Sequence, residues 1–124
     1  MSIVIDRVRI TAAGKQQLST LKRRTGIEHY NVICRHALCL SLANESPTPM
    51  ENMQFGGGLE IDWRTFAGEA DSTLLNILIS RTIKENINVD PTSVKQILTL
   101  HLHRGLSYLA SNSDSLLQSQ HIKY

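Results

Sequence analysis

Aliphatic side chains recur at helical spacing in four separate segments, and this pattern constrains the fold more than any other feature of the chain. The segments are residues 11–25, 28–43, 70–86 and 91–110, and turn-forming residues separate them. Gly26 follows the first segment, and Asp90-Pro91 gives the last one a capping residue and a first-turn proline. Aromatic residues make up only 5% of the chain, so the core must be mostly Leu, Ile and Val. The sequence of 124 residues therefore predicts a single mainly α domain with four or five helices.

Two short segments alternate polar and apolar residues, which is typical of half-buried strands. Residues 6–11 place Val8 and Ile10 on one side and Arg7 and Arg9 on the other. Residues 59–63 alternate in the same way and could form a second strand. An isolated strand of this length is not stable, so the N-terminal strand needs a partner. That partner could come from the same chain or from a second subunit.

The composition divides the predicted domain into four parts. Residues 1–43 form a basic strand-helix-helix unit, 44–69 a Pro/Gly-rich acidic connection, 70–110 a helical hairpin and 111–124 a polar tail that frays. The connection contains Gly56-Gly57-Gly58, which leads into an extended run without a lysine. A phosphate-binding loop needs a different context, so this triglycine indicates a flexible or tight turn.

Charge is distributed unevenly along the chain. Residues 1–43 hold seven cations against two carboxylates, a net +5, whereas residues 44–79 hold one cation against six carboxylates, a net −5. Residues 80–124 carry a net +2, from five cations and three carboxylates. A basic front predicts a polyanionic ligand, and an acidic middle predicts a protein partner or a second copy of the chain. The candidate DNA-binding residues, which would contact the phosphate backbone, are Arg7, Arg9, Lys15, Lys22, Arg23, Arg24 and Arg35.

The first third of the chain resembles the ribbon-helix-helix family of DNA-binding proteins. In that arrangement two chains pair their strands, and Arg7, Arg9 and Thr11 would point into a DNA groove. The match is partial, because Glu28 and Tyr30 occupy positions where small hydroxyl residues would contact phosphate, and Glu28 would repel it. The cations Lys22, Arg23 and Arg24 could also serve only to compensate a helix dipole. A dimeric ribbon-helix-helix transcriptional repressor is therefore an alternative function.

No pattern of residues predicts catalysis, a cofactor or a metal ion. His101 and His103 lie two residues apart on a predicted helix and face different directions, and His29, His36 and His121 add no ligand spacing. Glu60, Asp62, Glu69 and Asp71 could bind a metal or perform acid–base work, but an acidic face for a protein partner is at least as well supported. We expect Arg64 to pair with these acids across an interface. The sequence therefore predicts a protein that is not an enzyme.

The cysteines and the hydropathy pattern predict a cytoplasmic protein. Cys34 and Cys39 lie too far around a helix to pair, so we expect reduced, buried side chains. The chain contains no apolar run of membrane-spanning length, and its first residues do not form a signal peptide.

The order of motifs along the whole chain resembles the DndE family of DNA sulfur modification proteins. The motifs are the strand at 6–11, the two helices after it, residues 56–69 (GGGLEIDWRTFAGE), and Asp90-Pro91 with residues 101–106 (HLHRGL). The resemblance implies membership of the bacterial DNA phosphorothioation system, in which sulfur replaces a non-bridging oxygen of the DNA backbone. In that system a cysteine desulfurase, an iron–sulfur protein and an ATPase perform the chemistry.

The family resemblance also implies a small helical protein that forms a homotetramer and binds DNA, notably nicked duplex. It supplies no residue-level site, so the candidate DNA-binding residues rest on charge and position. Three functions are open at this stage. The first is a non-catalytic DNA-binding accessory protein of phosphorothioation, and the second is the dimeric repressor. The third is a scaffold that holds a modification enzyme through the acidic segment 45–71.

Overall fold

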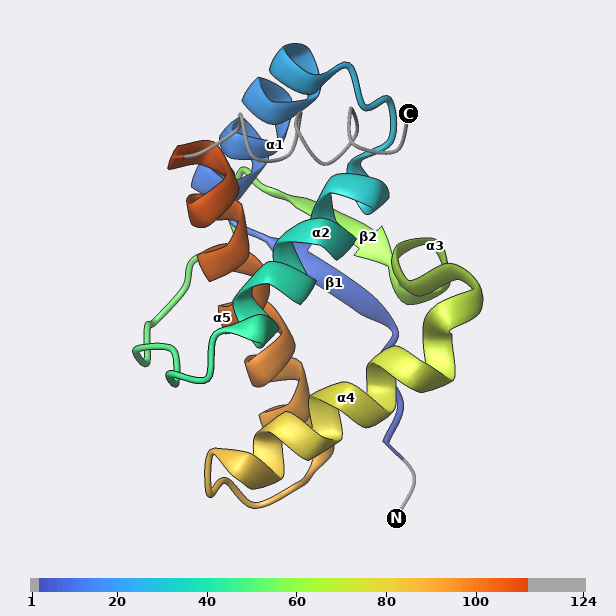
Figure 1. Cartoon of the computed structure of the whole chain (residues 1–124), viewed down its shortest axis with the longest axis vertical. Helices are drawn as coiled ribbons and strands as arrows, with labels where there is room; N and C mark the ends of the chain where they lie inside the picture. Colours follow the sequence, from blue (N-terminus) through green and yellow to red (C-terminus); the bar gives the residue numbers. More distant parts are fainter. Residues whose placement is uncertain (1–2, 112–124) are drawn as a thin grey trace.

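The computed structural model describes residues 3–111, in which helices pack on one face of a two-stranded ribbon (Figure 1). The mainly α fold with a short N-terminal strand is confirmed. In chain order the elements are β1 (Arg7–Ile10), α1 (Ala12–Thr25), α2 (Tyr30–Ala43), β2 (Leu59–Asp62), α3 (Trp63–Ala67), a single 3₁₀ turn (Gly68–Ala70), α4 (Asp71–Lys84) and α5 (Pro91–Ser111). The predicted polar tail and His121 lie outside the described residues, apart from Ser111.

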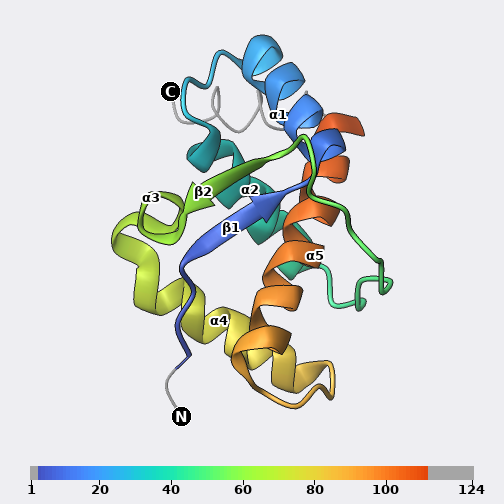
Figure 2. The same ribbon diagram turned by 180° about the vertical axis from the view of Figure 1, so that it is seen from behind.

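The N-terminal strand finds its partner within the same chain. β1 pairs antiparallel with β2, in a register that places Arg7 opposite Asp62 and Ile10 opposite Leu59. Val8 and Ile10 are buried against the helices, while Arg7 and Arg9 are exposed, as the alternation predicts. Figure 2 shows this ribbon on the outside of the molecule, beside α5. The ribbon of the ribbon-helix-helix alternative would need two chains, whereas here one chain forms both strands.

The predicted helix ends are confirmed by their capping contacts. The Thr11 hydroxyl accepts a hydrogen bond from the Gly14 amide at the start of α1 (3.0 Å), and Gly26 ends that helix in the left-handed region with φ of 74°. At the start of α5, an Asp90 carboxylate oxygen accepts from the Ser93 amide (2.8 Å), and Pro91 is the first helical residue. These caps depend on local chemistry, which is why the sequence alone predicts them.

The centre of the fold is the crossing of α2 and α5 (Figure 1). Gly105 lies on α5 directly against the backbone of Ala37 on α2, and a Cβ atom at this glycine would overlap the Ala37 carbonyl. The missing side chain lets the two helices approach closely. Buried aliphatic side chains fill the space around this contact, including Ile33, Leu38, Leu98, Leu102 and Leu106.

The triglycine forms a tight turn that brings β2 against the end of β1. The Gly58 amide donates to the Phe55 carbonyl (3.2 Å), and Gly57 adopts a positive φ of 78°. A Cβ atom at Gly58 would overlap the Ile10 carbonyl. The prediction of a turn in place of a nucleotide loop is thus confirmed, and close backbone approach explains the glycine at 58.

Residues 63–70, which fall in the predicted acidic connection, contain the short helix α3 and the 3₁₀ turn. Trp63 starts α3: its amide donates to the Asp6 carbonyl (2.9 Å), and its indole nitrogen donates to Asp71 (2.7 Å). The Trp63 and Phe66 rings stack with their centroids 5.7 Å apart. This anchored turn directs α4 across the lower end of the molecule (Figure 1).

The α2–α5 crossing generates a stability prediction. We expect Gly105→Ala to lower the free energy of unfolding by about 1–3 kcal/mol, because the new methyl group forces the helices apart. The gain in helix propensity of up to about 1 kcal/mol is too small to offset this strain. Urea denaturation measures the change.

Gly56→Ala is the matched control, because nothing lies within 4 Å of a Cβ atom at Gly56. We expect it to change stability by less than about 0.5 kcal/mol. Equal effects of the two substitutions would contradict the close-approach argument.

Candidate nucleic-acid interface

The exposed face of the ribbon carries both cations and carboxylates. Arg7 Nη1 lies 3.0 Å from Glu60 Oε2, and Arg9 Nε lies 3.4 Å from Glu60 Oε1. The Arg9 guanidinium also stacks over the Phe55 ring, 4.6 Å from its centroid. Exposed ion pairs of this kind contribute at most about 1 kcal/mol, so Arg7 and Arg9 can exchange Glu60 for another anion. Glu60 nevertheless neutralises part of their charge.

The outer face of α1 carries the largest group of uncompensated cations. Leu18 and Leu21 bury the inner face of this helix, which turns four cations outward: Lys15, Lys22, Arg23 and Arg24. None of the four forms an ion pair with another side chain among residues 3–111. We call these residues the α1 basic patch.

A shallow hollow adjoins the α1 basic patch where α1 ends and α2 begins. Its lining includes Ser19, Lys22, Arg23, Glu28 and Tyr30. The Lys22 ammonium lies 5.4 Å from the centre of the Tyr30 ring, and the Tyr30 hydroxyl is 3.1 Å from Ser19 Oγ. Glu28 is the acidic side chain of this lining. It occupies the position at which the sequence predicts that a carboxylate would repel phosphate.

Arg35 lies apart from the other candidate DNA-binding residues. It extends from α2 toward α3, where Nη1 donates to the Phe66 carbonyl (2.8 Å). Its guanidinium therefore holds the short helix in place. The structure brings Lys15, Lys22, Arg23 and Arg24 together on one helix and Arg7 and Arg9 together on the ribbon.

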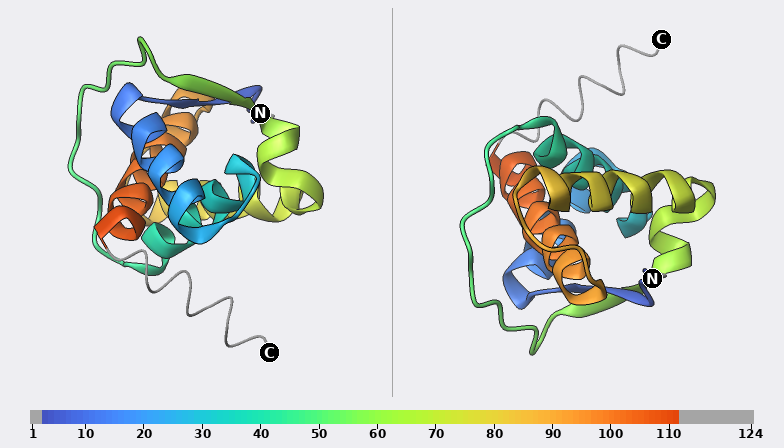
Figure 3. Two further views of the ribbon diagram at one scale, coloured as in Figure 1. Left: turned by 90° about the horizontal axis from the view of Figure 1, so that it is seen from above. Right: turned by 90° about the horizontal axis from the view of Figure 1, so that it is seen from below.

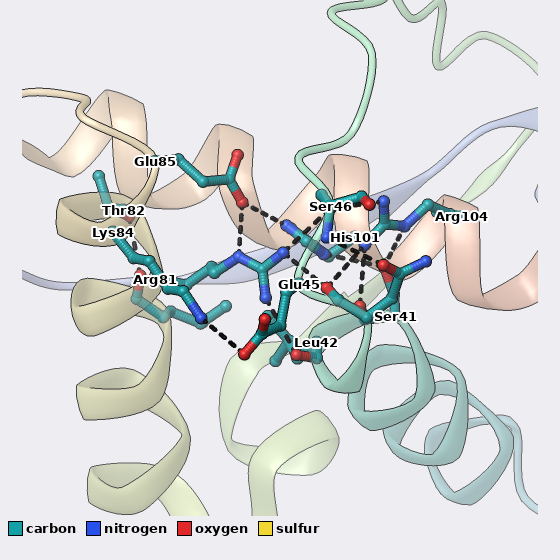
Figure 4. A network of polar contacts seen from close by, with 12 residues as sticks. Ser41, Leu42, Glu45, Ser46, Arg81, Thr82, Lys84, Glu85, His101 and Arg104 are labelled. Atoms are coloured by element: carbon teal, nitrogen blue, oxygen red, sulfur yellow. Dashed lines mark hydrogen bonds and ion pairs between the residues drawn. The ribbon is translucent and has the colours of Figure 1, made fainter.

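A buried polar network connects α2, α4 and α5, and no sequence pattern predicts it (Figure 4). His101 is fully buried: Nδ1 lies 2.8 Å from Ser41 Oγ, and Nε2 lies 2.9 Å from Glu85 Oε2. Arg81 Nε donates to the same Glu85 oxygen (2.7 Å), and Arg104 Nε donates to Ser41 Oγ (2.8 Å). The residues come from positions 41, 81, 85, 101 and 104, and no short spacing links the members that lie on different helices.

The hydrogen-bond partners determine the protonation states in this network. An ionised Glu85 can only accept, so His101 Nε2 carries a proton and Nδ1 accepts from the Ser41 hydroxyl. Burial lowers the pKa of His101, and the nearby Arg81 and Arg104 charges act in the same direction. Burial by itself would raise the pKa of Glu85, but hydrogen bonds from His101 and Arg81 hold it below its ordinary value.

Ser41, His101 and Glu85 are bonded in the order of a hydrolytic triad, but their surroundings fit a structural role. Ser41 is fully buried, and its oxygen accepts from Arg104 while donating to His101. The two guanidiniums bind backbone carbonyls in the last turn of α2 and just after it: Arg81 binds Leu42, Asn44 and Ser46, and Arg104 binds Ser41, Asn44 and Ser46. The network therefore fixes where the chain leaves α2.

His103 faces away from His101, as the sequence predicts, and joins α5 to the start of α1. Its Nδ1 donates to the Thr99 carbonyl (2.7 Å), and its Nε2 accepts from the Thr11 amide (3.1 Å). Burial lowers the pKa of His103, which favours the neutral form that this geometry requires.

The acidic residues of the middle segment serve different local contacts. Glu60 pairs with the ribbon arginines, Asp62 caps α3 by accepting from the Arg64 amide (3.1 Å), and Asp71 accepts from Trp63. Within the part of the chain that the structure describes, no group of three or more His, Cys, Asp or Glu side chains could hold a metal ion. The acids therefore do not form the metal cluster that the sequence left open.

The two cysteines differ in environment. Cys34 is buried, and burial raises the pKa of its thiol to about 12, which makes it unreactive. Cys39 is exposed, so the prediction that it packs in the core is wrong. It lies on the outward side of α2 beside Leu40, which is also exposed.

Comparison with known protein families identifies the family of this chain. A family model described as DNA sulphur modification protein DndE matches residues 7–116. The chain belongs to the DndE family.

Two solved structures of the family share the fold. The crystal structure of DndE from Escherichia coli B7A, involved in DNA phosphorothioation modification, has a TM-score of 0.73 at 22% identity, covering 87% of this chain and 99% of that one. The crystal structure of a DndE mutant with two glycines replaced by lysine has a TM-score of 0.70 at 18% identity, covering 86% and 99%. No curated protein matches the sequence. The DndE-family chain has no helix, within residues 3–111, that is long and apolar enough to cross a membrane.

The two buried histidines generate a pH prediction. Folding lowers their pKa values below the ordinary 6.5, so the unfolded chain binds protons that the folded chain excludes. The contribution of the two neutral histidines to the free energy of unfolding is complete above pH 6.5. It is lost as the pH falls through their lower folded-state pKa values. We expect the urea concentration at the midpoint of unfolding to decrease as the pH is lowered from about 7 to about 5. A His29→Gln variant should keep this dependence, because His29 is exposed; a midpoint that is constant or rises on acidification would refute the prediction.

Proposed function

We propose that this DndE-family protein is a non-catalytic, DNA-binding accessory protein of DNA phosphorothioation. The observation that carries the proposal is the α1 basic patch, in which Lys15, Lys22, Arg23 and Arg24 are exposed and unpaired among the described residues. Unpaired cations gain most from phosphate, because no protein carboxylate must first be displaced. Family membership, together with the E. coli relative that is involved in DNA phosphorothioation modification, supplies the biological context.

The ligand that suits this surface is the phosphate backbone of duplex DNA, nicked or intact. Cations along one helix face contact phosphates without reading base edges. The ribbon supports the repressor alternative less well, because its exposed face presents Glu60 and Asp62 beside Arg7 and Arg9. The non-catalytic role is supported by the buried, fully bonded state of Ser41 and His101.

The α1 basic patch is tested by neutralisation. We expect the triple variant Lys22→Gln, Arg23→Gln and Arg24→Gln to bind duplex DNA more weakly at low salt. Its slope of log affinity against log salt should become shallower by roughly 0.9 for each phosphate that the variant no longer neutralises. Fluorescence anisotropy over a salt series, with intact and nicked duplexes, measures both quantities.

A double variant, Arg64→Gln with Lys84→Gln, is the control, since it removes exposed cations from α3 and α4. Circular dichroism checks that α1 stays folded, because its last-turn cations also compensate the helix dipole. The proposal fails if the triple and control variants bind DNA alike, or if binding of the unaltered protein does not depend on salt.

We also propose that the protein acts as a homotetramer in the cytoplasm, together with other proteins of the phosphorothioation complex. Exposed apolar side chains on α2 and α4 support an assembly, since Leu40 is 43% exposed and Ile77 is 42% exposed. Light scattering is expected to give a tetramer mass. A monomer at all concentrations would contradict this part of the proposal.

A further inference from the structure

The segment between α2 and β2 runs along the outer side of α5 (Figure 3). Side chains of the segment and of α5 line a hollow between them. Met53 and Phe55 from the segment and Leu100 from α5 line it with apolar surface. Asn52, Gln96 and Thr99 add hydrogen-bonding groups. Thr92, Gln96, Thr99 and Leu100 follow helical spacing, so the hollow lies along one face of α5. We call it the Phe55 hollow.

A second hollow adjoins the Phe55 hollow and is cationic. Arg7 and Arg9 from β1 line it together with Lys95 from α5, and Phe55, Lys95 and Thr99 line both hollows. Two carboxylates oppose these three cations: Asp6 in the lining and Glu60, which pairs with both arginines. Lys95 is exposed and forms no ion pair with any side chain among residues 3–111. This second hollow keeps a net positive charge beside Lys95, which favours an anionic group there, while Glu51 adds a carboxylate to the neighbouring Phe55 hollow.

Phe55 is held in position at the boundary between the hollows. The Arg9 guanidinium stacks on its ring at 4.6 Å, and the His103 ring packs edge-on with its centroid 6.5 Å away. His103 is itself bonded to Thr11 and Thr99. A ring that its neighbours already fix loses little conformational entropy when a ligand stacks against it.

We propose that the two hollows together bind one unstacked nucleotide of a DNA strand, with the base in the Phe55 hollow and its phosphate beside Lys95 and Arg9. This inference rests on the proposed DNA binding but uses a surface separate from the α1 basic patch. Every base has an apolar face that can stack on an aromatic ring. Asn52 and Gln96 each offer a donor and an acceptor to a base edge, and Glu51, also in the lining, can accept from an exocyclic amine.

The test uses the full chain and two duplexes that differ at one position. One duplex is intact. In the other, one strand lacks a single nucleotide, and the unpaired nucleotide opposite this gap is a fluorescent adenine analogue. We expect the protein to prefer the gapped duplex and to quench the analogue, because the base stacks in the Phe55 hollow. Phe55→Leu should reduce the preference by about tenfold and remove the quenching. Lys95→Gln should weaken binding of the gapped duplex more than binding of the intact one.

Met50→Ala is the matched control, because Met50 lies on the same segment and is 70% exposed. It should leave both the preference and the quenching unchanged. The inference is overturned if the unaltered protein shows no preference for the gapped duplex, or if Phe55→Leu and Met50→Ala behave alike. If either result is found while the protein still binds intact duplex in a salt-dependent manner, only the nucleotide-site inference is overturned. If the protein binds no DNA at all, the proposed function is overturned as well.

Discussion

The direct contact between α2 and α5 at Gly105 is the constraint on which the rest of the structure depends. Because Gly105 has no side chain, the two helices lie close enough for residues in the preceding turn of α5 to reach Ser41 on α2. His101 and Arg104 make that connection, and Glu85 and Arg81 extend it to α4. The network holds carbonyls at the end of α2 and just after it, so it also directs the segment that leads to β2 and the ribbon.

The same geometry sorts the cations by role. Arg81 and Arg104 come from the part of the sequence with modest net charge, and they bind backbone carbonyls inside the molecule. Arg35 holds α3, and the ribbon arginines share Glu60. The cations of α1 remain unpaired among the described residues, because the buried side of that helix is apolar and its outer side has no neighbouring carboxylate in pairing distance. Charge counted along the sequence indicates a basic front, but the fold determines which of those charges a ligand can use.

A triad-like order of hydrogen bonds does not by itself indicate catalysis, as the arrangement of Ser41, His101 and Glu85 illustrates. Each group satisfies a hydrogen bond that another group needs, and the serine oxygen is enclosed between Arg104 and His101. A nucleophile must reach a substrate, whereas a buried and fully bonded hydroxyl stabilises the fold. Exposed hollows of the molecule lie elsewhere, beside α5 and at the junction of α1 and α2.

The sequence by itself determined the elements whose causes are local. Apolar periodicity predicted the helices, and Thr11, Gly26 and Asp90 marked their ends. Alternation predicted both strands and the two faces of the first one. Only the tertiary structure decided that β1 pairs with β2 of the same chain, that Cys39 is exposed, and that His101 on α5 joins Ser41 on α2 to Glu85 at the end of α4. These features depend on contacts between residues distant in sequence, such as Gly105 with Ala37 and Ser41 with His101. No local pattern encodes them, because packing of the whole chain determines which distant groups meet.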